Sequence, residues 1–361
     1  MFQIVSDTAC LRHWLIWVSS LTFLSNIIAV VAAQDDTTTA QPPAFADNSR
    51  FHNFTVKAHI SDRFEIYDPH SVEQLRAIRD MGFKQVILDW PNLHAEATQH
   101  GLDVVIANWW TIETEISEIE KRLEFVRDID PQRFAAISMM DEPERNSPDT
   151  PFSYYQALYG DLKKAMEQDY PKVPLQTSHW GPLASWNADE YQKFIPLYQS
   201  TDVIRIMPYP DLHEGPLGEV FYQMLRSRHI MHLAGRDIPQ LVILQTWVLP
   251  ENPKLPTIGE LRVMAYQAIL TGAETVSFFS YDPELWEKTP GFTQGFRDLM
   301  RELTTWTRQY KGNNVETTMS PDGILRATIV TSDNRRVGIR VNTNRGETDQ
   351  MPGLAIWTYC D

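Results

Sequence analysis

The chain has 361 residues, of which 43% are hydrophobic and 22% charged, a balance that excludes collagen-like, low-complexity and wholly disordered proteins and allows a sizeable core. Lys and Arg number 32 against 47 Asp and Glu, for a formal net charge of −15. Since nucleic acids and anionic membranes attract positive charge, we expect no nucleic-acid partner.

An apolar segment near the N-terminus, residues 14–33, follows Arg12 and His13 and ends in two alanines, a pattern typical of signal-peptidase sites. We predict a signal peptide over 1–33, with a retained membrane anchor as the alternative. Residues 34–50 are rich in Thr, Pro, Asp and Gln and are predicted to form a flexible lead-in. The remainder is expected to be secreted, periplasmic or otherwise extracytoplasmic, with no transmembrane domain after signal cleavage.

Eight apolar runs rich in β-branched residues predict eight strands, at 54–60, 83–88, 102–107, 134–140, 175–178, 203–207, 241–244 and 275–280. Several are continuously apolar, which is typical of parallel strands covered on both faces. Helical patterns lie between them at 71–81, 113–128, 151–168, 188–198, 218–233 and 258–270, with start signals such as Asp68-Pro69 ahead of the first. This alternation predicts an α/β fold, a TIM (β/α)8 barrel, over 51–312.

The pattern changes after residue 312. Residues 324–331 and 336–342 alternate in polarity around Ser332-Asp333-Asn334, a hairpin signal, and 354–359 is predicted as a third strand. We predict a small C-terminal β appendage over 313–361. Because three short strands bury little apolar surface alone, we expect the appendage to pack on the barrel.

The residues that close the predicted strands are unusually polar and aromatic. Active sites of TIM barrels lie at the carboxyl ends of the strands, so these residues are candidates for substrate binding. A mouth with several aromatic rings and carboxylates suits a carbohydrate substrate, because rings stack on sugar faces and charged groups bind hydroxyls; packing between barrel and loops is the alternative for any one residue. The candidates are Asp89, Trp90, Asn108, Trp109, His179, Trp180, Tyr209, Gln245, Trp247, Tyr281 and Asp282.

The fourth predicted strand ends in Asp141-Glu142-Pro143, which brings two adjacent carboxylates to the mouth. Glycoside cleavage needs a protonated acid at the leaving oxygen and a second group that stabilises the positive centre, either directly or by orienting an amide of the substrate. We predict Glu142 as the general acid and Asp141 as its catalytic partner. The alternative is helix capping, since proline and acidic residues are common in a first helical turn.

With this tripeptide at the end of the fourth strand, residues 54–310 resemble the glycoside hydrolase superfamily of TIM barrels, in which that position holds the acid/base. Retaining members of the superfamily carry an Asn-Glu pair there and a nucleophilic Glu at the end of strand seven, where this chain has Asp141 and Gln245. The Asp-Glu pair is similar instead to substrate-assisted hexosaminidases, including bacterial N-acetylgalactosaminidases. That resemblance implies that Glu142 protonates the leaving group and that Asp141 holds a 2-acetamido group.

Two further hypotheses stay open. An inverting hydrolase would use Asp89 or Asp282 across the mouth as the base that activates water. A catalytically silent barrel that binds carbohydrate or a surface partner would be consistent with Gln245 in place of the usual nucleophile. No metal or cofactor is predicted, because the histidines lack metal-ligand spacing and no Gly-rich phosphate loop occurs. Neither a particular sugar nor an oligomeric state is predicted.

Overall fold

The computed structural model describes residues 48, 51–88, 93–107, 129–143, 150–167, 169–179, 188–210, 215–248, 254–345 and 356–360. The predicted signal peptide at 1–33, the lead-in at 34–50 apart from Asn48, and the predicted helix at 113–128 lie outside these residues. None of the helices in the described ranges is long and apolar enough to cross a membrane.

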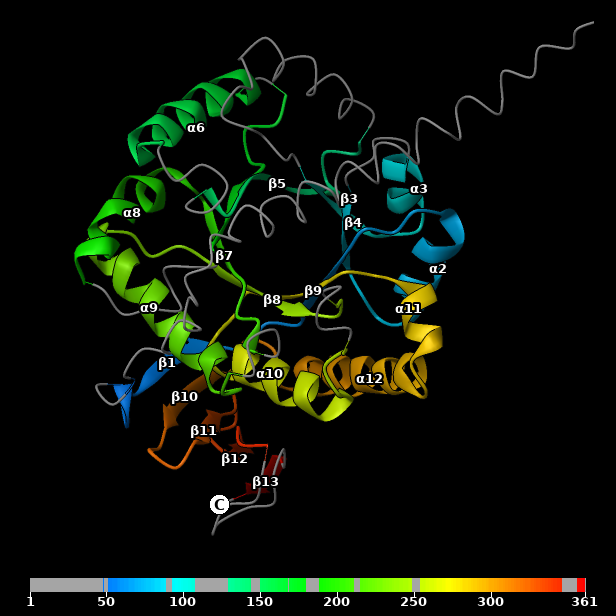
Figure 1. The fold of residues 1–361 in the computed structure, drawn as a ribbon, viewed down its shortest axis with the longest axis vertical. Helices are drawn as coiled ribbons and strands as arrows, with labels where there is room; N and C mark the ends of the chain where they lie inside the picture. Colours follow the sequence, from blue (N-terminus) through cyan, green and yellow to red (C-terminus); the bar gives the residue numbers. More distant parts are fainter. Residues whose placement is uncertain are drawn as a thin grey trace, which may run out of the picture. The chain divides into compact units, whose positions relative to one another are not determined.

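Eight parallel strands form a closed barrel, so the predicted TIM barrel is confirmed (Figure 1). The last strand pairs with the first, Glu65 lying opposite Ser277. Because all eight strands run the same way, their carboxyl ends meet at one rim. In order around the barrel, the strands are β2 (Arg63–Tyr67), β3 (Gln85–Leu88), β4 (Asp103–Ala107), β5 (Phe134–Asp141), β6 (Leu175–His179), β7 (Val203–Ile206), β8 (Gln240–Gln245) and β9 (Thr275–Phe279).

Helices follow most of the strands and lie around the barrel (Figure 1). α10 shows how the sequence begins one of them: the Thr257 hydroxyl accepts a hydrogen bond from the Glu260 N–H at 3.2 Å, and the Glu260 carboxylate accepts one from the Thr257 N–H at 2.8 Å. Five predicted helices match α2, α6, α8, α9 and α10, whereas α3, α11 and α12 were not predicted. The helices are α2 (Val72–Asp80), α3 (His94–Gln99), α6 (Phe152–Met166), α8 (Ala188–Ser200), α9 (Glu219–Leu233), α10 (Ile258–Leu270), α11 (Pro283–Lys288) and α12 (Phe292–Tyr310).

Strand residues alternate between two apolar clusters. In β8, Val242 and Leu244 belong to the larger cluster, which includes residues of the helices, whereas Leu241 and Ile243 belong to a smaller cluster of residues in the strands and at their ends. Because successive side chains of a strand point to opposite faces, the larger cluster lies between barrel and helices and the smaller one lies inside the barrel. By the same alternation Gln245, the last residue of β8, belongs to the inner face.

The prediction that residues 54–60 form the first barrel strand is wrong. They contain β1 (Val56–His59), which pairs antiparallel with β10 (Asn314–Met319), Val56 lying opposite Thr317. The first barrel strand is β2. Barrel strands were predicted from continuous apolar runs, and β2 has none because Arg63 and Glu65 interrupt it. Glu65 is tolerated there because a buried arginine pairs with it.

The C-terminal strands form one antiparallel sheet with β1, in the order β1-β10-β11-β12-β13. The predicted hairpin and third strand correspond to β11 (Ile324–Val330), β12 (Arg336–Asn342) and β13 (Ile356–Cys360), while β10 was not predicted. The sheet contacts α10: the Thr317 hydroxyl donates to the Leu270 main-chain oxygen at 2.6 Å, and Arg345 Nε lies 2.7 Å from Glu260 Oε1. The sheet therefore packs on the barrel as expected, and it does so by contacting α10, one of the helices around the barrel.

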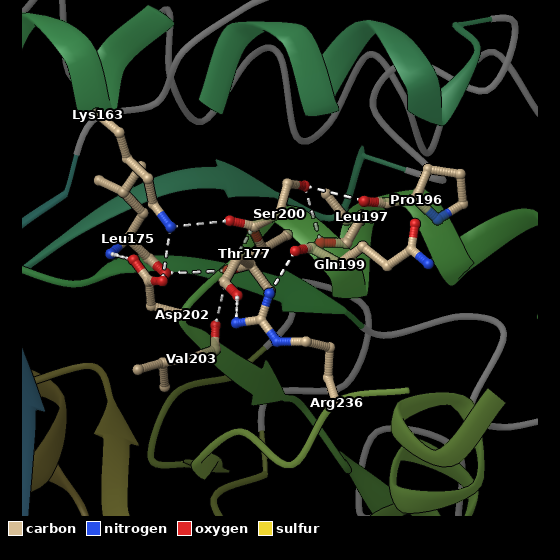
Figure 2. A network of polar contacts seen from close by, with 11 residues as sticks. Lys163, Leu175, Thr177, Pro196, Leu197, Gln199, Ser200, Asp202, Val203 and Arg236 are labelled. Carbon is tan, nitrogen blue, oxygen red and sulfur yellow. Dashed lines mark hydrogen bonds and ion pairs between the residues drawn. The ribbon is translucent and has the colours of Figure 1, made fainter. Parts of the chain in front are cut away.

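A polar network joins the amino-terminal ends of β6 and β7 to the end of α8 (Figure 2). Asp202 accepts hydrogen bonds from the Leu175 N–H at 3.0 Å and from Lys163 Nζ at 2.6 Å. The hydroxyl of fully buried Thr201 lies 2.9 Å from the main-chain oxygen of Leu175 and 3.1 Å from that of Val203. The network supplies partners to main-chain groups where the strands begin.

We expect Thr201→Val to lower the free energy of unfolding by about 1–3 kcal/mol, because it keeps the side-chain shape and removes a buried hydroxyl donor. Chemical denaturation measures the change. Ser200→Ala is the matched control, since the neighbouring Ser200 hydroxyl donates to main-chain oxygens from a half-buried position. A loss for Thr201→Val no greater than that for the control would contradict the expectation.

Candidate active site

The sequence predicts a site at the carboxyl-terminal rim of the barrel. Of its predicted residues, Asp89, Trp90, Asn108, Trp109 and Trp180 lie outside the described residues. For Asp141 the main chain is described: it ends β5 and lies opposite Ser178 of β6. Glu142, His179, Tyr209, Gln245, Trp247, Tyr281 and Asp282 are described and are considered below.

Glu142 follows β5 directly, at the carboxyl-terminal rim. Its N–H donates to the Ser178 main-chain oxygen of β6 at 3.2 Å, and the residue is 8% exposed. Its φ of 45° lies in the left-handed region, which residues other than glycine rarely adopt and which recurs at functional sites. The chain thus holds a buried glutamate in an uncommon conformation where the sequence predicts the general acid.

Four aromatic residues form a continuous series at the rim, which we call the aromatic arc: Tyr67, Phe279, Trp247 and Tyr209. Successive ring centres are 5.0, 5.9 and 6.3 Å apart, and each pair meets edge to face. The four residues come from the ends of β2, β9, β8 and β7, which are neighbours in the barrel. The arc therefore covers one continuous half of the rim, and such rings are suited to contact the C–H faces of a sugar.

Two buried polar atoms at the arc have no hydrogen-bond partner among the residues that the structure describes. Gln245 Nε2 donates to the Trp247 main-chain oxygen at 2.8 Å, which fixes the amide group. Gln245 Oε1 and Trp247 Nε1 are buried and make no hydrogen bond within the described part of the chain. A buried acceptor or donor without a partner costs free energy of folding. A hydroxyl group of a ligand can donate a hydrogen bond to Gln245 Oε1 or accept one from Trp247 Nε1.

Three other predicted contact residues already have partners inside the protein. The Tyr281 ring meets Trp286 of α11 edge to face at 5.0 Å, and burial raises the pKa of its hydroxyl, which stays neutral. Asp282 Oδ1 accepts a hydrogen bond from the Leu285 N–H at 2.9 Å and caps α11. The His179 ring stacks on Tyr198 of α8 at 5.5 Å, on the helix side of β6. Substrate contacts by these three residues stay predictions.

Three rim residues were not predicted from the sequence: Tyr67, Asp68 and Phe279. Tyr67 and Asp68 were missed because the first barrel strand was placed too early, and Phe279 because it was counted within the last strand rather than at its end. The signal that finds the first two is the sequence Arg63-Phe64-Glu65-Ile66-Tyr67, in which alternate residues are apolar or aromatic, followed by Asp68-Pro69. The structure brings Tyr67 and Phe279 together with two predicted residues, Trp247 and Tyr209.

An ion pair lies beneath the arc inside the barrel. Arg205 Nη2 of β7 is 2.8 Å from Glu65 Oε1 of β2, and neither side chain is exposed to solvent. The guanidinium carbon of Arg205 is 4.9 Å from the centre of the Tyr67 ring, a cation–π distance. Burial raises the pKa of Glu65, and the nearby Arg205 charge opposes this rise. Arg205 thus contacts both Glu65 in the interior of the barrel and Tyr67, the residue at one end of the arc.

His94, the first residue of α3, is another buried ionisable group near the rim. It is 5% exposed, its two ring nitrogens make no hydrogen bond within the described ranges, and burial lowers its pKa to about 4. The folded state therefore resists protonation of His94, whereas the unfolded chain accepts the proton near the ordinary histidine pKa. Stability linked to His94 is complete at neutral pH and is lost as the pH falls toward 4.

We expect the free energy of unfolding to fall by roughly 2 kcal/mol more in the unaltered protein than in His94→Leu when the pH is lowered from about 7 to 5. The variant lacks the titrating ring, so all other groups cancel in the comparison. Denaturant unfolding of both proteins at both pH values measures the difference. Equal pH dependence of the two proteins would show that His94 is accessible to protons in the folded state.

No family model and no curated protein matches the sequence. Similar folds are found among solved structures. A glucosidase from Croceicoccus marinus superposes with a TM-score of 0.57 at 13% identity, over 81% of this chain and 77% of the other. A protein named N2152 from Neocallimastix frontalis gives 0.51 at 12% identity, over 86% and 90% of the two chains, and an endo-β1,6-glucanase gives 0.51 at 9%, over 84% and 90%. At these identities the likeness shows the TIM-barrel fold, and the structural neighbours include glycoside hydrolases.

Proposed function

We propose that this protein is a glycoside hydrolase that acts outside the cytoplasm on a polysaccharide or glycoconjugate, with Glu142 as the general acid. The observation that carries the proposal is the shared rim: a buried glutamate follows β5 at the same end of the barrel at which the aromatic arc lines β7, β8, β9 and β2. A substrate sugar stacked on the arc would present its glycosidic bond toward the middle of the mouth. The glycoside hydrolases among the structural neighbours agree with this choice.

The chemistry assigned to the two carboxylates follows from their neighbouring positions. Glu142 gives its proton to the leaving oxygen as the bond to the anomeric carbon breaks. Asp141, one residue earlier, stabilises the positive charge that develops there, either directly or by holding a 2-acetamido group of the substrate. Gln245 supplies hydrogen bonds rather than a nucleophile, because an amide does not form a glycosyl-enzyme ester.

A carbohydrate-binding barrel without catalysis is the second candidate. The observation that favours it is Gln245, which stands where the retaining relatives carry their nucleophile. In that case sugar would bind to the aromatic arc and to Gln245 Oε1 and Trp247 Nε1, which lack partners in the described part of the chain. Glu142 would then serve as a buried structural carboxyl group.

Hydrolysis of a panel of nitrophenyl glycosides and unactivated oligosaccharides by the purified protein tests the proposal. The panel pairs each N-acetylhexosaminide with the hexoside that lacks the amide. Release of product supports a hydrolase, and a marked preference for the acetamido member of a pair supports the role of Asp141 in orienting that group. Binding of oligosaccharides, measured by calorimetry, without hydrolysis of any of them would favour the binding barrel.

A further inference from the structure

Asp68 lies at the rim of the barrel, directly after the last residue of β2. Its N–H donates to the Ile87 main-chain oxygen of β3 at 3.1 Å, and the main-chain oxygen of the preceding Tyr67 accepts from the Tyr281 N–H at 3.0 Å. The φ of Asp68 is 70°, again in the left-handed region that residues other than glycine rarely adopt. The ends of two neighbouring strands thus fix the main chain that carries this carboxylate.

The ordinary structural roles of an aspartate before a helix are filled by other residues. Ser71 caps α2, its hydroxyl accepting from the Gln74 N–H at 3.2 Å. Asp282, the aspartate that follows the neighbouring strand β9, does act as a helix cap and accepts a hydrogen bond from Leu285. Asp68 makes no such bond within the described residues, so capping does not explain its position.

The two oxygens of Asp68 differ in their surroundings. Oδ1 is shielded from solvent and has no hydrogen-bond partner among the residues that the structure describes. Oδ2 lies 3.6 Å from His70 Nε2. Burial raises the pKa of Asp68, although the nearby His70 partly opposes the rise. The side chain as a whole is 33% exposed, so solvent water reaches the carboxylate from the side of Oδ2. A carboxylate with a raised pKa is a stronger base once ionised, and carboxylates of this kind are concentrated at functional sites.

Asp68 and Glu142 lie on different sides of the mouth. Around the barrel the order is β2, β3, β4, β5, so three strand steps separate the strand before Asp68 from the strand before Glu142. Inverting glycosidases place two carboxyl groups on opposite sides of the bond to be cleaved, with room for a water molecule at the second one. The sequence offered Asp89 or Asp282 for that second position, and Asp282 is engaged in capping α11.

We propose that Asp68 is the second catalytic carboxylate of this site, the general base that activates water for attack on the anomeric carbon. The inference rests on the proposed glycoside hydrolase function. A water oxygen forms a bond to the anomeric carbon while a water proton passes to the Asp68 carboxylate. The bond from that carbon to the leaving oxygen breaks, and Glu142 gives its proton to the leaving oxygen. Exchange of one proton with solvent at each residue restores both, and the product has the inverted anomeric configuration.

Asp68→Asn keeps the shape of the side chain and removes its ability to accept the proton. We expect kcat on an unactivated oligosaccharide to fall by about 10² to 10⁴-fold. Sodium azide should restore part of the rate, because the anion attacks the anomeric carbon without a base and gives a glycosyl azide of inverted configuration. The matched control is Asp62→Asn, at the amino-terminal end of the same strand, where the carboxylate pairs with Lys84 and Lys311. This control should lose stability and keep its turnover per folded molecule.

The anomer released by the unaltered protein, followed by NMR, tests the same inference without any variant. Inversion together with a rate loss in Asp68→Asn that azide partly restores supports it. Retention of configuration, full activity of Asp68→Asn, or a loss that azide does not restore would overturn the role of Asp68 and leave the proposed function standing. Absence of hydrolysis by the unaltered protein would overturn the proposed function, and this inference with it.

Discussion

Glu142→Gln is expected to reduce hydrolysis of an unactivated oligosaccharide by about 10² to 10⁴-fold while the protein stays folded. Glutamine has the shape of glutamic acid and can occupy the same buried position after β5, so the change removes only the transferable proton. The loss should be smaller with nitrophenyl glycosides, because nitrophenolate leaves without protonation. Steady-state kinetics on both substrate types, with circular dichroism to check the fold, measures the effect.

The difference between the two substrate types separates a general acid from a structural carboxyl group. A merely structural Glu142 would lower both activities by the same factor, through loss of folded protein. Glu316→Gln is a suitable control, since Glu316 pairs with Lys57 on the surface of the C-terminal sheet. Unchanged hydrolysis of an unactivated oligosaccharide by Glu142→Gln would remove this residue from the mechanism.

The barrel was predictable from sequence because most of its strands are covered on both faces and therefore appear as apolar runs. The exception is β2, where Glu65 faces the interior and pairs with Arg205 of β7. That pairing joins residues 140 positions apart, so no local pattern contains it. Once the first strand was misplaced onto β1, the rim residues Tyr67 and Asp68 could not be found.

For the site, the sequence identified which residues reach the rim but not which way their side chains point. His179 and Gln245 both end barrel strands, yet His179 packs on α8 while Gln245 belongs to the inner face. A side chain at a strand end faces either way according to the register of the barrel, which depends on all eight strands. Asp282 shows a second reason: its role as the cap of α11 depends on a helix that the sequence analysis did not predict.

The buried ion pair should produce the largest stability effect in the barrel. Arg205→Met removes the charged partner of Glu65 and leaves a wholly buried carboxylate with only the Ser277 hydroxyl to stabilise its charge, so we expect the free energy of unfolding to fall by about 3–5 kcal/mol. The double variant Glu65→Leu/Arg205→Met replaces both charges with apolar groups and should recover most of the loss. Denaturant unfolding of the two single variants and the double variant gives the coupling between the two residues.

The pH dependence of Arg205→Met provides the sharper test. Without the arginine, only the Ser277 hydroxyl still lowers the pKa of Glu65, and burial, the largest influence, holds the folded-state pKa above the unfolded value. A carboxyl group with a raised folded-state pKa costs stability as the pH rises above its unfolded pKa, because the unfolded chain releases the proton first. The double variant lacks this carboxyl group and is therefore the reference: the stability of Arg205→Met relative to the double variant should be highest in acid and should fall toward neutral pH. A stability difference between the single and the double variant that does not depend on pH would mean that water reaches Glu65 in the folded state of Arg205→Met.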